Sequence, residues 1–351
     1  MRFEREDGEP LPPIADADWL AAWPAWLSSC QALASPHNPR RHTWLAVCDD
    51  AQRLVPRGGA QVRDFFARHM DRYRVLALEA RADPDATPRE AWSPARGARV
   101  REHSSGLVTG YYEPVLAGSR QRVAPFVVPV YRPPPVLPTA ARAELEASGQ
   151  LRGQELLWVR EAVEAFFLEV QGSGRIQLTD GTSIRLAYAA NNGQPYRSIG
   201  RWLVAQGELA PDQVSLQAIR DWARAHPRRV RELLDQNPRV VFFRELPLGD
   251  ADAGPVGALG VALTPGVSVA IDPRFLPLGA PLLLYTSAPA SGEPLARIVV
   301  AQDTGAAIRG ALRIDWFWGQ GTLAEEISGR QHAQGSVRLL VPRGVAPAAL
   351  L

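Results

Sequence analysis

The chain has 351 residues, of which 46% are hydrophobic and 22% charged, a composition typical of a globular protein with about two domains. Its formal net charge is only +2, so charge gives no argument for binding nucleic acid or acidic membranes. All 39 basic residues are arginine, and the six histidines are scattered, which argues against a zinc site.

The two cysteines and the N-terminal residues give information on the cellular compartment of the protein. Cys30 and Cys48 lie outside any Cys-x-x-Cys motif, and they form either a disulfide in an exported protein or two unrelated thiols. The first residues lack the apolar core of a signal peptide, and no apolar run approaches the ~20 residues of a membrane span. Taken literally, the sequence predicts a soluble, cytosolic protein.

Residues 1 to about 100 are predicted to be helical and rich in loops. Asp16 or Asp18 is placed to cap a helix that carries a tryptophan-rich stripe between residues 19 and 27. The helical spacing of this stripe favours core packing over sugar stacking. A second helix is predicted at 61–78, and the segment 81–99, rich in proline and charge, is predicted to be a surface connection.

The next motif is Thr-Gly-Tyr-Tyr-Glu-Pro, from Thr109 to Pro114. Adjacent tyrosines in a strand point to opposite faces, so only one of Tyr111 and Tyr112 can face the core. The other ring is then available to a sugar. On the residues alone, an edge strand that ends at Pro114 is an equally good interpretation.

Composition shifts after Pro114, and the segment 114–243 is interpreted as a β-rich domain inserted into the first. Asp180-Gly181 between alternating runs predicts a hairpin over 175–188. Gln171-Gly-Ser-Gly-Arg175 is either a tight turn or a polymer-binding loop, and the sequence does not decide between them. The other predicted elements are an extended segment at 125–138, a strand at 166–170, and helices at 139–147, 196–206, 215–226 and from 227 to about 237.

From residue 239 onward strands dominate, and short strands with Gly and Pro turns predict a small closed barrel. The predicted strands are 240–243, 256–263, 267–271, 282–285, 297–301 and 336–341.

Two carboxylates follow the strand at 297–301. Asp303 ends it, and Asp315 lies among Ile314, Trp316 and Phe317. Large apolar neighbours remove hydration from a carboxyl group and raise its pKa towards the range of a general acid. The residues therefore predict either acid catalysis or a structural carboxylate bound to backbone donors.

The pattern D-T-G-x-A-I-x-G-x-x-R-x-D-x-F-x-G, from Asp303 to Gly319, resembles the C-terminal signature of the membrane-bound lytic transglycosylase A family. Those enzymes cleave the glycan strands of bacterial peptidoglycan. The resemblance continues, in the family's order, in Thr109–Pro114, Gln171–Arg175, Asn192–Gly200 and Val269–Gly279, and it covers roughly residues 100 to 340.

The resemblance implies a fold that is mainly β with helices, of the α+β class. A double-psi β-barrel domain would be built from residues 1–113 and 244–351. Residues 114–243 would form an inserted, β-barrel-like domain that binds substrate, with a groove between the two domains. The three aspartates of the family's barrel match Asp272, Asp303 and Asp315.

The resemblance also implies the roles of site residues. Asp315 is expected to be the catalytic acid, and Asp303 to orient it or to supply a hydrogen bond that strengthens in the transition state. The expected substrate-binding residues are Thr109, Tyr111, Tyr112, Glu113, Gln171, Ser173, Arg175, Tyr196, Arg197 and Asp272.

The activity that the resemblance implies is non-hydrolytic cleavage of the β-1,4 bond between N-acetylmuramic acid and N-acetylglucosamine. The product would be a 1,6-anhydro sugar, formed by single-aspartate acid/base catalysis without metal or cofactor. The expected partners are peptidoglycan glycan strands and other cell-wall enzymes. A periplasmic, outer-membrane-associated location is expected, and it conflicts with the lack of a visible export signal. A signal or lipid anchor that was trimmed or lies upstream of this start would resolve the conflict, which stays open here.

Two other classes of function stay open at this point. Asp303-Thr304-Gly305 resembles the active-site turn of aspartic proteases, but the chain lacks the second such turn that a shared proton requires, unless a homodimer supplies it. A peptidoglycan-binding module with purely structural carboxylates is the non-enzymatic alternative.

Overall fold

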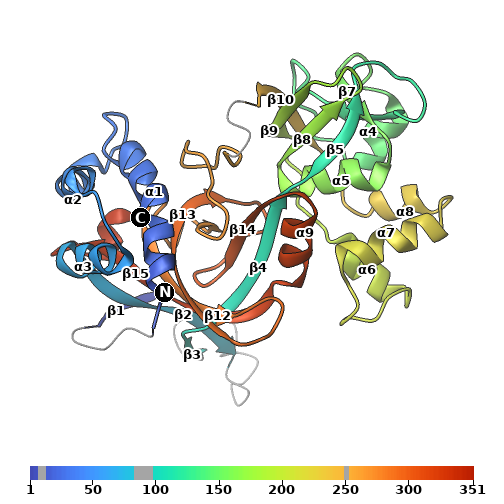
Figure 1. Cartoon of the computed structure of the whole chain (residues 1–351). Coiled ribbons are helices and arrows are strands. Elements are labelled where there is room, and N and C mark those ends of the chain that lie inside the picture. Colours follow the sequence, from blue (N-terminus) through green and yellow to red (C-terminus); the bar gives the residue numbers. More distant parts are fainter. Residues whose placement is uncertain (7–12, 83–97, 249–252) are drawn as a thin grey trace. The chain divides into compact units, whose positions relative to one another are not determined.

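The computed structural model describes residues 1–6, 13–82, 98–248 and 253–351 (Figure 1). The chain divides into two compact units. Unit 1 comprises residues 1–110, 257–317 and 331–351, and unit 2 comprises residues 111–256 and 318–330. Helices and strands occur in both units, and over the described chain as a whole strands hold more residues than helices, so the predicted α+β class is confirmed.

The elements of unit 1 are β1 (Arg2–Arg5), α1 (Asp16–Leu33), α2 (Arg41–Arg53), α3 (Gly59–His69), β2 (Met70–Ala82), β3 (Ala98–His103), β4 (Gly106–Glu113), β11 (Ser268–Ile271), β12 (Pro281–Ser287), β13 (Pro294–Thr304), β14 (Ile314–Gln320), β15 (His332–Pro342) and the 3-10 helix η1 (Pro347–Leu350). Strands β4 and β14 run on into unit 2.

The elements of unit 2 are β5 (Val115–Ser119), β6 (Val128–Tyr131), α4 (Arg142–Ser148), β7 (Glu155–Val159), α5 (Ala162–Gln171), β8 (Ser173–Leu178), β9 (Ser183–Asn191), α6 (Ile199–Ala205), α7 (Leu216–Ala225), α8 (Val230–Leu234), β10 (Val241–Pro247) and α9 (Gly321–Arg330).

Within the described part of the chain, six strands form a closed ring. Their order is β15-β12-β13-β11-β14-β4, and β4 pairs back with β15, with Thr109 opposite His332. A closed sheet has no free edge, because every strand finds two neighbours. The small closed barrel expected from the sequence is therefore present, and its double-psi crossing stays a prediction.

The N-terminal helices form an aromatic core. Trp23 of α1 packs edge-on against Phe65 of α3 with ring centroids 5.0 Å apart, and Trp26 lies 6.0 Å from Trp44 of α2. These rings are buried, so the core-packing interpretation of the tryptophan stripe is confirmed. A disulfide between Cys30 and Cys48 ties α1 to α2 and settles the question of the two cysteines.

Gln302 connects α1 to the barrel. Its buried amide nitrogen donates to the Ala25 carbonyl and to the Ser29 hydroxyl, both at 2.9 Å. Its amide oxygen accepts a hydrogen bond of 2.5 Å from Ser268 on β11. Because every polar atom of this side chain is satisfied, its burial fixes the end of β13 at low cost. The next residue along the chain is Asp303.

In unit 2, the described strands form one sheet in the order β10-β9-β8-β5-β7-β6. Strands β8 and β9 are the predicted hairpin, whose turn places Gly181 at φ 84°, a conformation that favours glycine. One core cluster lies against this sheet, and a second joins α5 to α6, α7 and α8 through Phe166 and Trp222.

Several predicted elements are wrong. The helix predicted at 61–78 ends at His69, where β2 begins, and the strand predicted at 166–170 belongs to helix α5. Residues 256–263 form turns rather than a strand. Helix α1 begins at Asp16, with Ala15 as its N-cap, so neither Asp16 nor Asp18 caps it. Most of the surface connection predicted at 81–99 lies outside the described residues.

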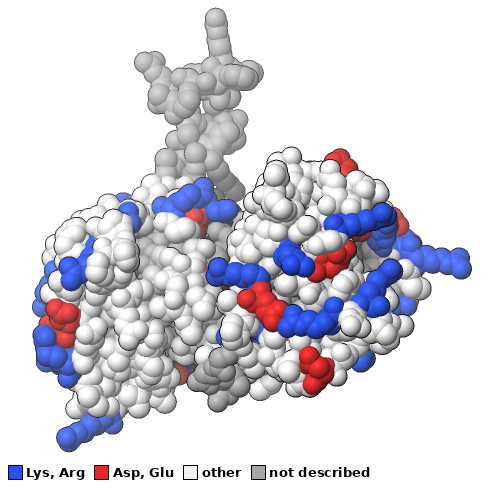
Figure 2. Space-filling view, turned by 90° about the horizontal axis from the view of Figure 1, so that it is seen from above, with Lys and Arg blue, Asp and Glu red and all other residues white. Residues whose placement is uncertain are grey.

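Figure 2 shows blue arginines and red acidic side chains adjoining one another, as the many ion pairs of the chain require. One such pair joins Arg120 to Glu245 and another joins Arg297 to Asp18. Among the described helices, none has both the length and the apolar character needed to cross a membrane.

Candidate active site

Sheet register places two of the three aspartates in one row of the barrel. Ala270 of β11 pairs with Asp303 of β13 on one side and with Asp315 of β14 on the other. Paired residues of neighbouring strands project their side chains from the same face of the sheet. Asp303 and Asp315 are two strand spacings apart, so their backbones are separated by roughly 10 Å. Ala270, whose side chain is small and buried, lies between them in this row.

A bulge creates this row. Val269 pairs with Ala301, but the next residue, Ala270, pairs with Asp303, so the register skips Gln302. A bulge re-aims side chains locally. Here it lets Gln302 bond to α1 while Asp303 comes into register with Asp315.

Asp315 is held by β4. The Thr109 hydroxyl donates a 2.5 Å hydrogen bond to Asp315 Oδ1, and Arg313 donates to the Thr109 oxygen at 2.7 Å. Arg313 is itself fixed because it also donates to the Ile314 carbonyl at 2.5 Å. Three side chains thus form a relay from a guanidinium, through a hydroxyl, to a carboxyl group.

Burial raises the pKa of Asp315 to about 6. Arg313 and the hydrogen bond from Thr109 oppose the shift, and the negative charge of Asp303 adds to it. Desolvation outweighs the nearby positive charge because it penalises only the ionised form of the carboxyl. The raised pKa predicted from the apolar neighbours is confirmed, and near pH 6 this group can both donate and accept a proton.

Asp303 differs from Asp315 in its surroundings. It is partly exposed, and its Oδ1 accepts a 3.0 Å hydrogen bond from the backbone N–H of Ala258. The barrel thus presents one carboxyl with a raised pKa and a second carboxyl held by a backbone donor.

Asp272 is fully buried and makes structural bonds. It accepts 2.9 Å hydrogen bonds from the Gly310 N–H and from Arg274 Nε, and its second oxygen lies 2.6 Å from Arg274 Nη2. These bonds, above all those from Arg274, lower its pKa to about 2. The Asp272 anion thereby anchors the loop that joins β13 to β14, which carries Gly310 at φ 112°.

The remaining predicted residues lie in unit 2. Tyr112 is buried whereas Tyr111 is partly exposed, so the predicted alternation of the two rings is confirmed. Gln171 Oε1 accepts a 3.1 Å hydrogen bond from the Tyr112 N–H and fixes the strand at this point. Tyr111 therefore presents the accessible ring.

Glu113 is fully buried between two arginines. Its carboxylate accepts from Arg175 Nε at 2.9 Å and from Arg185 Nε at 2.7 Å. Both guanidiniums also donate to the Ala253 carbonyl. A carboxylate without solvent access acts on a ligand only through the groups it holds, so the triad positions the strand that carries Tyr111 and Tyr112.

The glycines of Gln171–Arg175 have local roles. Gly172 ends helix α5 at φ 77°, and a Cβ on Gly174 would approach Leu168 to 2.3 Å. The glycines therefore make the close turn between α5 and β8, and a role of this segment in binding a polymer stays a prediction. Ser173 is partly exposed at the start of β8, Arg197 is exposed, and Tyr196 is partly exposed with a pKa raised by burial.

The sequence did not single out Arg313 or Arg185 as site residues, although Arg313 is part of the D-T-G signature. Arg185 could not have been found locally, since it reaches Glu113 only through the register of β8 and β9. Among the residues that the structure describes, no group of three or more His, Cys, Asp or Glu is placed to hold a metal ion.

Comparison with known proteins supports this architecture. Two protein-family profiles match the chain, the MltA specific insert domain at residues 107–244 and the 3D domain at residues 267–341. The first profile covers the middle of the chain, and the second covers the range that contains Asp272, Asp303 and Asp315.

Curated relatives are similar over most of the chain. The membrane-bound lytic murein transglycosylase A of Escherichia coli K12 is 37% identical over 242 residues, 66% of this chain and 64% of that protein. The protein of that name from Vibrio cholerae is 33% identical, over 82% of this chain and 78% of its own length. The chain thus spans somewhat under two thirds of the first relative's length and more of the second.

Solved structures cover nearly the whole chain. The lytic transglycosylase LtgG of Burkholderia pseudomallei is 42% identical, with a TM-score of 0.61 over 98% of this chain and 96% of that one. Escherichia coli MltA with bound chitohexaose is 27% identical, with a TM-score of 0.74 over 97% and 95%. The chain belongs to the membrane-bound lytic murein transglycosylase A family.

Proposed function

We propose that this protein is a lytic transglycosylase that cleaves peptidoglycan between N-acetylmuramic acid and N-acetylglucosamine and leaves 1,6-anhydromuramic ends. The observation that carries the proposal is Asp315, a carboxyl group whose pKa is raised to about 6 and which Thr109 and Arg313 hold in place. Its relatives are named lytic murein transglycosylases, which supports the same activity.

In the proposed mechanism, protonated Asp315 gives its proton to the oxygen of the β-1,4 bond, and the N-acetylglucosamine departs. The oxocarbenium-like muramoyl ring is then attacked by its own C6 hydroxyl, whose proton passes to the Asp315 carboxylate. The nucleophile belongs to the same sugar, and its high effective molarity lets it outcompete water. Asp315 thus ends the reaction in the protonated state in which it began.

Other residues support this step in the proposal. Asp303 orients the reacting groups or stabilises positive charge on the ring. Thr109, Tyr111, Gln171, Ser173, Tyr196 and Arg197 contact the glycan directly. The predicted contact of Tyr112 is not retained because its ring is buried, and Glu113, Arg175 and Asp272 act through the backbone that they hold. We further propose that residues 1–113 and 244–351 form a double-psi barrel domain and that residues 114–243 are its insert, a division that the match of the insert profile at 107–244 supports.

The proposed location is the periplasm, with association to the outer membrane, and the proposed partners are glycan strands and other cell-wall enzymes. The relatives are named membrane-bound, and the disulfide between Cys30 and Cys48 favours an oxidising compartment. The chitohexaose bound to Escherichia coli MltA supports a glycan substrate for this chain as well.

The test is digestion of purified murein followed by mass spectrometry. We expect muropeptides one water lighter than hydrolase products, without a reducing muramic end. Hydrated ends would instead indicate hydrolysis, and peptide fragments would support the aspartic-protease alternative. Murein that is bound but left intact would support a binding module.

The pH profile follows from the Asp315 pKa. The first step needs the protonated acid, so the rate should fall as pH rises through about 6. The hydrogen bond from Thr109 lowers this pKa, so its removal in Thr109→Val should move the alkaline limb to higher pH. The measurement is the rate of murein cleavage by both proteins from pH 4 to 9. An alkaline limb at the same pH in Thr109→Val and the parent would contradict the role of Thr109.

A further inference from the structure

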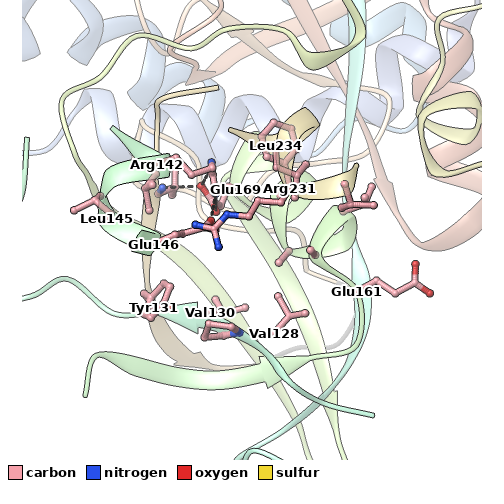
Figure 3. A pocket seen from close by; sticks show the side chains of 18 of the residues that line it. Val128, Val130, Tyr131, Arg142, Leu145, Glu146, Glu161, Glu169, Arg231 and Leu234 are labelled. Carbon is pink, nitrogen blue, oxygen red and sulfur yellow. Dashed lines mark hydrogen bonds and ion pairs between the residues drawn. The ribbon is translucent and has the colours of Figure 1, made fainter. Parts of the chain in front are cut away.

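Unit 2 contains a cavity that the proposed cleavage does not use. Its volume is about 840 Å³, and its lining comes from β6, α4, α5, α8 and β10 (Figure 3). The inner lining is apolar and buried, with Val130, Leu145, Val163, Phe166 and Leu234 among its members. A cavity of this size and character is typical of a binding site for a small molecule or a short peptide.

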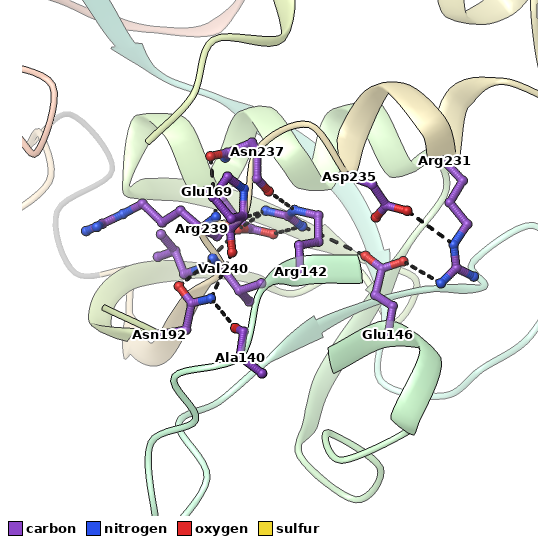
Figure 4. A network of polar contacts seen from close by, with 12 residues as sticks. Ala140, Arg142, Glu146, Glu169, Asn192, Arg231, Asp235, Asn237, Arg239 and Val240 are labelled. Carbon is purple, nitrogen blue, oxygen red and sulfur yellow. Dashed lines mark hydrogen bonds and ion pairs between the residues drawn. The ribbon is translucent and has the colours of Figure 1, made fainter. Parts of the chain in front are cut away.

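One wall of the cavity is a completed polar network (Figure 4). Arg142 is buried and pairs with both oxygens of Glu169, at 3.1 and 2.7 Å. It also donates to the carbonyls of Asn237 and Arg239, and Glu169 accepts from the Val241 N–H. Since the donors of this guanidinium are engaged, the pair acts as a rigid, neutral wall.

Beside this wall lies a second pair with unused bonding capacity. Glu146 of α4 is 4.0 Å from Arg142 and 3.8 Å from Arg231 of α8, too far for hydrogen bonds. Arg231 is also 3.6 Å from Asp235, whose buried Oδ1 has no hydrogen-bond partner among the described atoms. Figure 3 shows Glu146 and Arg231 close together, next to Arg142 and Glu169. The cavity thus presents a solvent-exposed carboxylate next to a solvent-exposed guanidinium, and the two form an ion pair without a hydrogen bond.

Opposite charges beside an aliphatic interior match an amino acid with a free ammonium and a free carboxylate, borne on a short peptide. The peptides that branch from murein glycan have this chemistry. We propose that the cavity of unit 2 binds the murein stem peptide, with its ammonium at Glu146 and its carboxylate at Arg231.

This inference rests on the proposed function for the choice of peptide, and its test does not depend on cleavage. The probe is the N-acetylated tripeptide L-Ala-γ-D-Glu-meso-diaminopimelate, whose L-Ala nitrogen is an amide as it is in murein, titrated into the whole protein by calorimetry. We expect saturable binding that Glu146→Gln weakens by about tenfold, the loss typical of one charge-assisted hydrogen bond. Arg231→Gln, which changes a different helix, should weaken it similarly.

Glu144→Gln is the matched control, because Glu144 is an exposed acid on the same helix α4 and does not line the cavity. It should bind the tripeptide like the parent. Circular dichroism of each variant verifies the fold. The inference is overturned if the parent protein does not bind the tripeptide, if Glu146→Gln and Arg231→Gln bind it as the parent does, or if chitotriose displaces it.

The two proposals fail separately. A protein that binds the tripeptide and leaves murein uncleaved retains the cavity site and loses the proposed activity. A protein that releases anhydromuropeptides and ignores the tripeptide retains the activity and loses the cavity site.

Discussion

Asp315→Asn should lower the rate of murein cleavage by roughly 10²- to 10⁴-fold, the range typical of a lost general acid. The amide has the same shape and can still accept the hydrogen bond from Thr109, but it cannot supply the proton. The measurement is the initial rate of anhydromuropeptide release. Binding of chitohexaose should change little, because the substitution removes a proton donor and leaves the shape of the site.

Asp212→Asn is the control for this substitution, since Asp212 is exposed on a turn of unit 2. Its rate should equal that of the parent. If Asp315→Asn retains the parental rate with a normal melting temperature, then Asp315 is not the acid, and Asp303 becomes the carboxyl to test next.

Glu113→Gln should destabilise unit 2 by roughly 3–5 kcal/mol, the cost of leaving buried charge without its partner. Arg175 and Arg185 share this one carboxylate, and neither is exposed by more than 7%. A glutamine keeps the volume and removes the charge, so the effect reports electrostatics rather than a cavity. Urea denaturation, monitored by tryptophan fluorescence, measures the change in the free energy of unfolding.

Glu245→Gln breaks a more exposed pair with Arg120 on the same sheet, and it should cost only about 0–1 kcal/mol. Adding Arg185→Met to Glu113→Gln should recover part of the loss, because one unpaired cation is then removed. Equal urea midpoints for Glu113→Gln and Glu245→Gln would mean that the buried triad contributes no more to stability than a surface ion pair.

The sequence predicted elements best where local signals agree. Asp180-Gly181 fixed the hairpin, and Ser215 caps α7 as expected, accepting a hydrogen bond from the Ala218 N–H. The segment 166–170 misled because a short apolar run fits a strand and a buried helix equally well. Gly172, in a left-handed conformation just after α5, was the available sign of a helix end. No glycine or proline separates α3 from β2, so nothing local announced that boundary.

The site was predictable in its parts and not in its arrangement. The apolar neighbours of Asp315 correctly indicated a raised pKa, since desolvation depends on nearby residues. The alignment of Asp303 with Asp315 depends on a bulge at Gln302, and the burial of Glu113 depends on Arg185 from another strand. Such pairings arise from register between distant segments, which a single sequence does not encode in readable form.

The two unequal carboxylates, Asp315 and Asp272, also bear on how the protein tolerates acid. A carboxylate whose folded pKa is depressed from 3.8 to about 2 adds stability above pH 4 and loses it only as pH falls towards 2. At pH 4 to 5, Asp315 already holds its proton while Asp272 still grips the Gly310 loop. Mild acidification therefore protonates Asp315, the proposed catalytic acid, and leaves the hydrogen bonds of the Asp272 carboxylate in place.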